Sequence, residues 1–322
     1  MKKLAALALV LVMALGLAAC GGSKKWPESD ITIICPFGAG GAMDRSARLT
    51  AKYLAKQLGV NVEVSNVTGG GNWIGYGQVI EAKGDGYTLG FSNYPGQVGG
   101  YLNPSNKVPY TYKSFTNIAD IVHDPGILVV LPDSPYQTLN DLIEAAKKEK
   151  MTVSTGGAKG SDDDVLLRLL NQKYGTQFVP GGNKDDADAK TTLFGKAVVA
   201  QACNVSNYYD KWNGTGEGYV RVLAVFDSER NEMMKDIPTA KEQGIDLISS
   251  SDRGMVATPN LDKDVLAKIV EALKAVEKDP EFQAEAKSQG MGINMLFGED
   301  FEKFIQGVED NMKGLLKELE WE

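Results

Sequence analysis

Two glycine-rich segments of the chain have the composition of an anion-binding loop. The first, CPFGAGGAMDR at residues 35–45, follows a β-branched run at 31–34 and precedes apolar residues at helical spacing from Ala47 to Leu58. The second, STGGAKGSDDD at residues 154–164, also lies between a predicted strand and a predicted helix. The start of a helix leaves unpaired backbone N–H groups and a partial positive charge, so both junctions suit an anion. A tight turn is the alternative for each loop alone, and two such loops in one chain favour a shared cleft.

The first loop does not match the phosphate-binding motifs of nucleotide enzymes. Residues 38–45 contain neither G-x-x-x-x-G-K-[ST] nor G-x-G-x-x-G, and no lysine follows the glycines. One histidine and no C-x-x-C pair give no sign of a metal site or a histidine-based catalytic cluster, so we expect no metal and no cofactor. His123 is predicted to be a loop or hinge residue. Cys35 and Cys203 are either a disulfide or, as we favour, two small buried residues.

The N-terminus has the features of an export signal. Lys2 and Lys3 precede the apolar run 4–19, which is too short for a transmembrane helix of about 20 residues. The small residues before Cys20 resemble the lipobox of bacterial lipoproteins, which implies cleavage before Cys20 and a lipid on its thiol. An ordinary signal peptide with an incidental cysteine is the alternative. We expect a lipoprotein signal peptide at 1–19, a lipid-anchored leash at 20–26 and an extracytoplasmic mature chain.

Charge and length limit the class of protein further. The 322-residue chain has a formal net charge of −8 and no basic patch, so nucleic acid is not an expected partner. A mature chain of about 300 residues has ample core for one or two domains.

Predicted strands and helices alternate along most of the chain, which favours an α/β fold with mostly parallel sheets. Thr138 and Asp141 have the spacing of a capping box at the start of one helix. Predicted strands cover 31–35, 62–64, 87–91, 127–131, 152–155, 177–179, 197–202, 220–226, 246–248 and 255–257, and predicted helices cover 44–58, 73–82, 138–148, 165–174, 186–194, 263–278, 280–289 and 300–319.

An ordered set of motifs resembles one receptor family. The solute receptors of tripartite tricarboxylate transporters, the Bug family, have stretches similar to ITIICPFGAGGAMDR, VNVEVSNVTGGGNWIG, GDGYTLGFSN, LVVLPDSPYQTLNDLIEAAK and RVLAVFDSERNEMMKDIPTAKEQGIDL in this order. The resemblance covers nearly all of residues 27–322. It implies a two-domain periplasmic-binding-protein clamshell of type II-like form, each domain a mostly parallel sheet flanked by helices. Domain one would be 27–125 plus 253–322 and domain two 126–252, with hinge crossovers near Gly126 and Arg253.

The resemblance also implies which residues hold the ligand, which in this family is usually a small carboxylate. The first loop, Pro36 to Asp44, would receive one carboxylate on backbone N–H groups. The second loop, Ser154 to Ser161, would receive the other end of the ligand. The expected ligand-binding residues are Phe37, Gly38, Ala39, Gly40, Gly41, Ala42, Asp44, Gly71, Asn72, Trp73, Ser92, Asn93, Ser154, Thr155, Gly156, Gly157, Ala158, Lys159, Ser161, Asp162, Asn204 and Asn207.

The segment after the second loop departs from the family pattern. Family members often have threonine and then histidine where this chain has Asp162, Asp163 and Asp164. Acidic residues are ordinary first-turn residues of a helix, which is one explanation. The other is that one of them faces the cleft, repels a second carboxylate and favours a ligand with an amine. Lys159 and Lys184 are basic candidates there, with a solvated position as the alternative.

The function implied by the resemblance is that of a receptor and not of an enzyme. A monomeric, membrane-anchored receptor would deliver a small carboxylated metabolite to the permease subunits of a tripartite tricarboxylate-type transporter. Two alternatives stay open. The same fold could present its ligand to a signalling partner as a sensor, and an extracytoplasmic hydrolase with Ser92 or Ser154 as nucleophile would show turnover.

Overall fold

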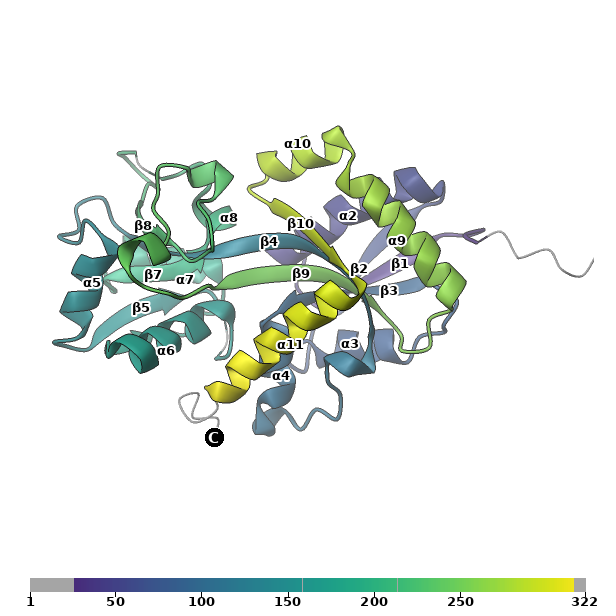
Figure 1. Ribbon diagram of the computed structural model, residues 1–322, viewed down its shortest axis with the longest axis horizontal. Helices are drawn as coiled ribbons and strands as arrows, with labels where there is room; N and C mark the ends of the chain where they lie inside the picture. The colour runs from purple at the N-terminus through teal and green to yellow at the C-terminus, as the bar shows by residue number, and fades with distance from the viewer. Residues whose placement is uncertain (1–25, 158, 213, 316–322) are drawn as a thin grey trace, which may run out of the picture.

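The computed structural model describes residues 26–157, 159–212 and 214–315 (Figure 1). The predicted signal peptide, the lipidation site Cys20 and Ala158 of the second loop lie outside the described residues. Two groups of strands, which we call the first and second lobe, are joined by two long strands that run across the middle of the molecule (Figure 1).

The first lobe is built on three parallel strands in the order β2-β1-β3. The first loop leaves the sheet at the carboxyl end of β1, which is the edge where open α/β sheets bind ligands. Gly59 ends the helix after this loop in the left-handed region at φ 71, and its N–H donates to the carbonyl of Ala55. The elements of this lobe are β1 (Ile31–Cys35), α2 (Ala42–Leu58), β2 (Val62–Asn66), α3 (Trp73–Ile80) and β3 (Thr88–Tyr94).

The second lobe repeats this plan with parallel strands in the order β7-β5-β6. The predicted capping box at its first helix is present, since the side chains of Thr138 and Asp141 accept each other's backbone N–H. The second loop leaves the carboxyl end of β5. The elements are α5 (Leu139–Ala146), β5 (Met151–Thr155), α6 (Asp162–Tyr174), β6 (Phe178–Pro180), α7 (Asp186–Phe194), β7 (Ala200–Asn204), α8 (Val205–Tyr208) and β8 (Arg221–Val225).

Two long strands join the lobes. β4 (Thr116–Val130) pairs antiparallel with β9 (Ser250–Ala257) in the middle, and with β7 and β8 in the second lobe. β9 also pairs antiparallel with β3 of the first lobe. One continuous sheet path, β2-β1-β3-β9-β4-β7-β5-β6, therefore carries both loops.

The remaining helices cover the first lobe and the junction. α11 crosses the front of the molecule from the first lobe toward α4 and α6 (Figure 1). These elements are α4 (Gly96–Leu102), α9 (Lys263–Glu277), α10 (Pro280–Ser288), β10 (Gly292–Phe297) and α11 (Gly298–Gly314), with short 3-10 turns at Pro104–Asn106, Tyr112–Ser114, Glu232–Met234 and Lys241–Gln243.

Separate apolar cores fill the lobes, and one further cluster connects them. In the first lobe, residues of β1, β3 and β9 pack against α2 and α9. In the second lobe, one cluster packs α5 and α6 on the sheet and another includes Cys203 and Tyr208. The connecting cluster joins Val165 of α6 to Val98 of α4 and Met312 of α11, so the two lobes contact each other along this side.

The α/β class and most predicted elements are confirmed, but α4 and α8 were not predicted, and four further points are corrected. The segment 246–248 is not a strand, and the strand predicted at 127–131 is the end of the much longer β4. His123 lies inside β4 rather than in a loop. β10, which pairs antiparallel with β4, was not predicted. No helix among the described residues has the length and apolar character needed to cross a membrane.

Candidate functional site

The first loop is held in shape by Asp44. This carboxylate is 3 % exposed and accepts the backbone N–H of Gly40 at 2.8 Å and the amide of Asn66 at 2.9 Å. It also pairs with Arg48 at 2.9 Å. Burial alone would raise the pKa of Asp44, but these hydrogen bonds outweigh it and lower the pKa. Asp44 therefore organises the loop from inside.

The start of α2, which follows the first loop, has no side-chain cap. Its N-cap residue is Gly41, which offers no side chain to the N–H groups of the first turn. Gly38, Ala39, Gly40 and Gly41 are exposed. An uncapped helix start behind an exposed loop leaves backbone donors and a partial positive charge available to an anion.

The other first-lobe candidates divide into two groups. Trp73 joins an aromatic cluster and stacks on Tyr110, with ring centroids 6.3 Å apart, so it has a packing role. Asn93 is 9 % exposed and donates to the hydroxyl of Ser251 at 2.8 Å. Ser92 is fully buried, and its hydroxyl contacts that of Tyr76 at 3.4 Å. Phe37 packs against the first-lobe core, while Gly71 and Asn72 form the turn before α3 with positive φ.

The second loop uses its own acidic residues to satisfy its backbone. The N–H of Gly156 donates to Asp163 at 2.9 Å, and the N–H of Gly160 donates to Asp164 at 2.8 Å. Ser161 caps α6 by accepting the N–H of Asp164. In both loops a glycine N–H donates to an aspartate four residues on, but the second loop has in addition the bond from Gly156 to Asp163 and the side-chain cap Ser161, where the first has the uncapped Gly41.

The predicted second-loop residues lie at different depths. Ser154 and Thr155 are buried, and the Ser154 hydroxyl contacts the carbonyl of Ala200 at 3.5 Å. Gly157 is half-buried, whereas Lys159 and Lys184 are exposed.

The structure brings Asp162, Asn204 and Asn207 together. The Asn204 amide donates to Asp162 at 2.8 Å and to the carbonyl of Asp124 at 3.1 Å. The Asn207 side chain accepts the backbone N–H of Asn204 at 2.9 Å. Burial raises the pKa of Asp162 to about 7, although the Asn204 hydrogen bond acts in the opposite direction.

Sequence reasoning missed a buried charged pair where the two lobes join. Arg253 of β9 and Asp124 of β4 are 3 % and 1 % exposed, and their nitrogen and oxygen are 2.7 Å apart. Asp124 also accepts the backbone N–H and the hydroxyl of Ser206, on α8 of the second lobe. Arg253 Nη1 lies 3.4 Å from the hydroxyl of Ser46 on α2. This pair links the first turns of two helices that belong to different lobes.

A second charged group surrounds His123 in the same strands. Its Nδ1 lies 2.6 Å from Asp252, and its Nε2 lies 3.2 Å from Asp227. Burial acts to lower the pKa of His123, but the hydrogen bonds to Asp227 and Asp252 outweigh it and raise the pKa to about 11. His123 is therefore a cation at neutral pH. The signal in the sequence was the density of charge in ADIVHDPG and SSDRG, two segments that were not predicted as strands and that lie in β4 and β9.

The lobes also touch at Tyr209, whose hydroxyl donates to the carbonyl of Ser288 at 2.9 Å. On the opposite side, the backbone of Gly160 lies against Gly99 of α4 so closely that a Cβ on Gly99 would be 3.0 Å from the Gly160 carbonyl oxygen. The lobes therefore contact each other at Tyr209 and at the second loop.

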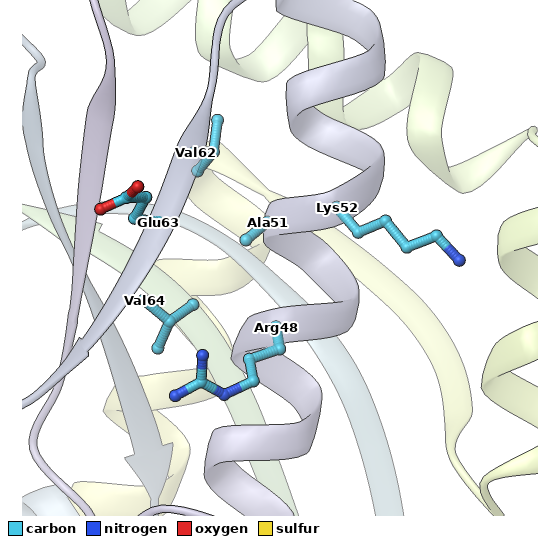
Figure 2. A pocket seen from close by; sticks show the side chains of 6 residues that line it. All are labelled: Arg48, Ala51, Lys52, Val62, Glu63 and Val64. Atoms are coloured by element: carbon cyan, nitrogen blue, oxygen red, sulfur yellow. The ribbon is translucent and has the colours of Figure 1, made fainter.

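A surface cavity lies elsewhere, between α2 and β2. Its volume is about 490 Å³, and Figure 2 shows Arg48, Ala51, Lys52, Val62, Glu63 and Val64 around it. Arg48 and Lys52 are already paired, with Asp44 and Glu285. We do not place the functional site there, because its charges are satisfied and neither loop lines it.

Two smaller expectations can be compared with the structure. No group of three His, Cys, Asp or Glu among the described residues is arranged to hold a metal ion. Cys35 and Cys203 are buried free thiols, as we favoured, and burial raises the pKa of Cys35 to about 11.

The comparisons with known proteins agree with this arrangement of loops and strands. The family described as "Tripartite tricarboxylate transporter family receptor" matches residues 46–321. The chain belongs to this family. A UPF0065 protein of Agrobacterium vitis is 31% identical over 258 residues, which are 80% of this chain and 73% of that protein.

Solved structures of receptors share the fold. The periplasmic binding protein BugD is 28% identical, with a TM-score of 0.73 over 92% of this chain and 99% of that one. A protein of R. palustris, solved with adipate, is 20% identical, with a TM-score of 0.78 over 91% of this chain and 98% of that one. The predicted family and two-domain periplasmic binding fold are confirmed. Members of the tricarboxylate transporter receptor family are solute-binding receptors, which are not a class of enzyme.

Proposed function

We propose that this receptor captures a small carboxylated metabolite between its lobes and delivers it to the permease of a tripartite tricarboxylate-type transporter. The observation that carries the proposal is the uncapped start of α2, behind an exposed glycine loop at the junction of the lobes. Charge-assisted hydrogen bonds from such N–H groups are worth about 1.5–3 kcal/mol each. The adipate in the R. palustris structure is a carboxylate of the expected class.

The proposal assigns the binding role to part of the predicted residue set. Gly41 and Ala42 supply backbone donors, while Asp44 shapes the loop. Asn93, Asp162, Asn204 and Asn207 form polar walls where the lobes meet. The division into domains at 27–125 plus 253–322 and 126–252 belongs to this proposal, with ligand entry by opening of the lobes.

The cellular setting is proposed from the sequence. A lipid on Cys20 would hold a monomeric receptor on the outer side of a bacterial membrane, next to its permease. The sensor alternative differs only in its partner, so uptake by cells with and without the permease genes separates the two. For the hydrolase alternative, both candidate nucleophiles, Ser92 and Ser154, are fully buried, which favours binding over turnover.

The test is a thermal-shift screen of mono-, di- and tricarboxylates and amino acids, with Gly41→Val as the site variant. Gly41 has φ −72, and a Cβ there would meet nothing nearer than 3.6 Å, so valine fits the backbone while its branches cover the start of α2. Gly307→Val in α11, where a Cβ meets nothing within 4 Å, is the matched control. A ligand at a hundred times its Kd adds about 2.7 kcal/mol of stability. We expect the control to keep this shift and Gly41→Val to lose it, and an unchanged shift in Gly41→Val would refute the site.

A further inference from the structure

The second lobe presents more negative charge to the junction than its own cations neutralise. Asp162, Asp163 and Asp186 lie around the second loop. The carboxylate of Asp186 packs directly against Gly156, since a Cβ built on Gly156 would be only 1.8 Å from Oδ1 of Asp186. None of the three forms an ion pair with a lysine or arginine in the described part of the chain. Their partners are amides or a backbone N–H: Asn204 for Asp162, Gly156 for Asp163 and Asn207 for Asp186.

Two other carboxylates of the junction do have a cation. Asp124 is paired with Arg253 at 2.7 Å, and Asp252 is paired with His123 at 2.6 Å. Lys190, the nearest lysine of α7, instead donates to the carbonyl of Asn207 at 2.7 Å and lies over the ring of Tyr208. Three carboxylates without a paired cation therefore lie together around the second loop.

The protonation behaviour of these three groups agrees with a missing cation. Burial is the main cause that raises the pKa of each, and for Asp163 the neighbouring Asp162 and Asp186 raise it further. A positive charge placed among them would relieve both the burial cost and the mutual repulsion.

A second, independent observation concerns a donor without an acceptor. Arg253 is 3 % exposed, and its Nε has no hydrogen-bond partner among the described residues, although its Nη2 reaches Asp124. Buried polar groups are normally paired, so an orphan Nε on a buried guanidinium points to an acceptor that the protein itself does not provide. Nη1 of the same side chain lies beside Ser46 in α2, so this donor belongs to the side of the junction where the open N–H groups are.

We propose that the ligand is a zwitterion, a small amino acid whose carboxylate binds the start of α2 and Arg253 while its ammonium group binds Asp186 and Asp162. This inference rests on the proposed function and narrows its substrate class. The first-lobe side supplies donors without acceptors, and the second-lobe side supplies carboxylates without a cation. One carboxylate of a plain dicarboxylate would bind the first-lobe donors, but its other carboxylate would be repelled by the carboxylates of the second lobe.

The experiment compares matched pairs of compounds that differ only in the amine, by calorimetry on the purified protein at pH 7.5. The pairs are succinate and aspartate, glutarate and glutamate, propionate and alanine, and phenylpropionate and phenylalanine. We expect the amino acid of at least one pair to bind ten times or more tightly than its partner. Equal or tighter binding by the compounds without an amine overturns the zwitterion and leaves the carboxylate receptor standing. No binding by any of the eight overturns both.

Asp186→Asn tests the residue, and Asp210→Asn is the matched control. Asn keeps the shape of the side chain and removes the charge, and Asp210 is an exposed acid that follows α8. We expect Asp186→Asn to reduce the preference for the amino acid at least fivefold and to leave binding of its partner unchanged or improved. Asp210→Asn should change neither. A preference that survives Asp186→Asn and also Asp162→Asn overturns the assignment, and the compound pairs on the unmodified protein decide the matter if a variant does not fold.

Discussion

The buried pair Asp124–Arg253 makes a sharp prediction about how the lobes are held together. Breaking a buried ion pair by removing one partner costs about 3–5 kcal/mol, because the other charge is left buried. In Arg253→Met, Asp124 keeps two donors from Ser206, so we expect a loss near the lower end, about 3 kcal/mol. In Asp124→Asn, Arg253 keeps its charge beside a neutral amide and the long contact to Ser46, so we expect about 5 kcal/mol.

The double variant decides whether these costs come from the pair itself. With both charges removed, neither residue leaves the other as an unpaired buried charge, and we expect a loss well below the sum of the single losses. Urea unfolding followed by tryptophan fluorescence measures this, since Trp73 and Trp212 belong to different lobes. Asp133→Asn breaks the exposed pair with Lys196, whose side chains are both 66% exposed, and should leave the urea midpoint unchanged. Additive losses in the double variant, or a single loss no larger than that of the exposed pair, would refute the reasoning.

Three further predictions follow from individual contacts. Gly156→Ala should cost about 1–3 kcal/mol and weaken amino acid binding, because the new Cβ would overlap the Asp186 carboxylate; unchanged calorimetric affinity would contradict it. Asp44→Ala should lower both the melting temperature and carboxylate affinity, since the loop loses the bond from Gly40 and the pair with Arg48; a thermal-shift series with and without ligand measures both effects. The melting temperature of the ligand-free protein should fall from pH 5 to pH 9. Folding raises the pKa of Asp162 to about 7 and that of His123 to about 11, so over this range the folded state holds protons that the unfolded chain releases. A melting temperature that rises with pH would contradict this prediction.

The first loop was predictable from the sequence because its signal is local. A β-branched strand, four small residues and a helical pattern fix a strand-loop-helix unit without reference to the rest of the chain, and β1 and α2 lie close to the predicted bounds. The role of Asp44 follows from the same local geometry, since its partner Gly40 is only four residues away.

The buried charged pair where the lobes join could not be predicted, because the two residues that form it are far apart in the chain. Asp124 and Arg253 are 129 residues apart, and they meet only because β4 and β9 pair antiparallel. The charged residues of ADIVHDPG and SSDRG lie in strands that are buried, and no local pattern in either segment indicates which charged residue pairs with which. Asp186 was overlooked for the same reason, since it contacts the second loop only after α7 packs on β5.

The opposite character of the two loops suggests how the receptor selects its ligand. Each loop precedes a helix start, yet the Gly41 end of α2 has no side-chain cap, whereas α6 is capped by Ser161 and two of its first three residues, Asp163 and Asp164, accept N–H groups of the loop. A ligand with two carboxylates would meet an attractive helix start on one side and carboxylates on the other. Because Asp162 and Asp186 are desolvated, that repulsion is larger than between charges in water. Selection by this site would therefore depend more on rejecting the second carboxylate than on extra affinity for the amine, and a neutral Asp186→Asn receptor should accept both classes of ligand.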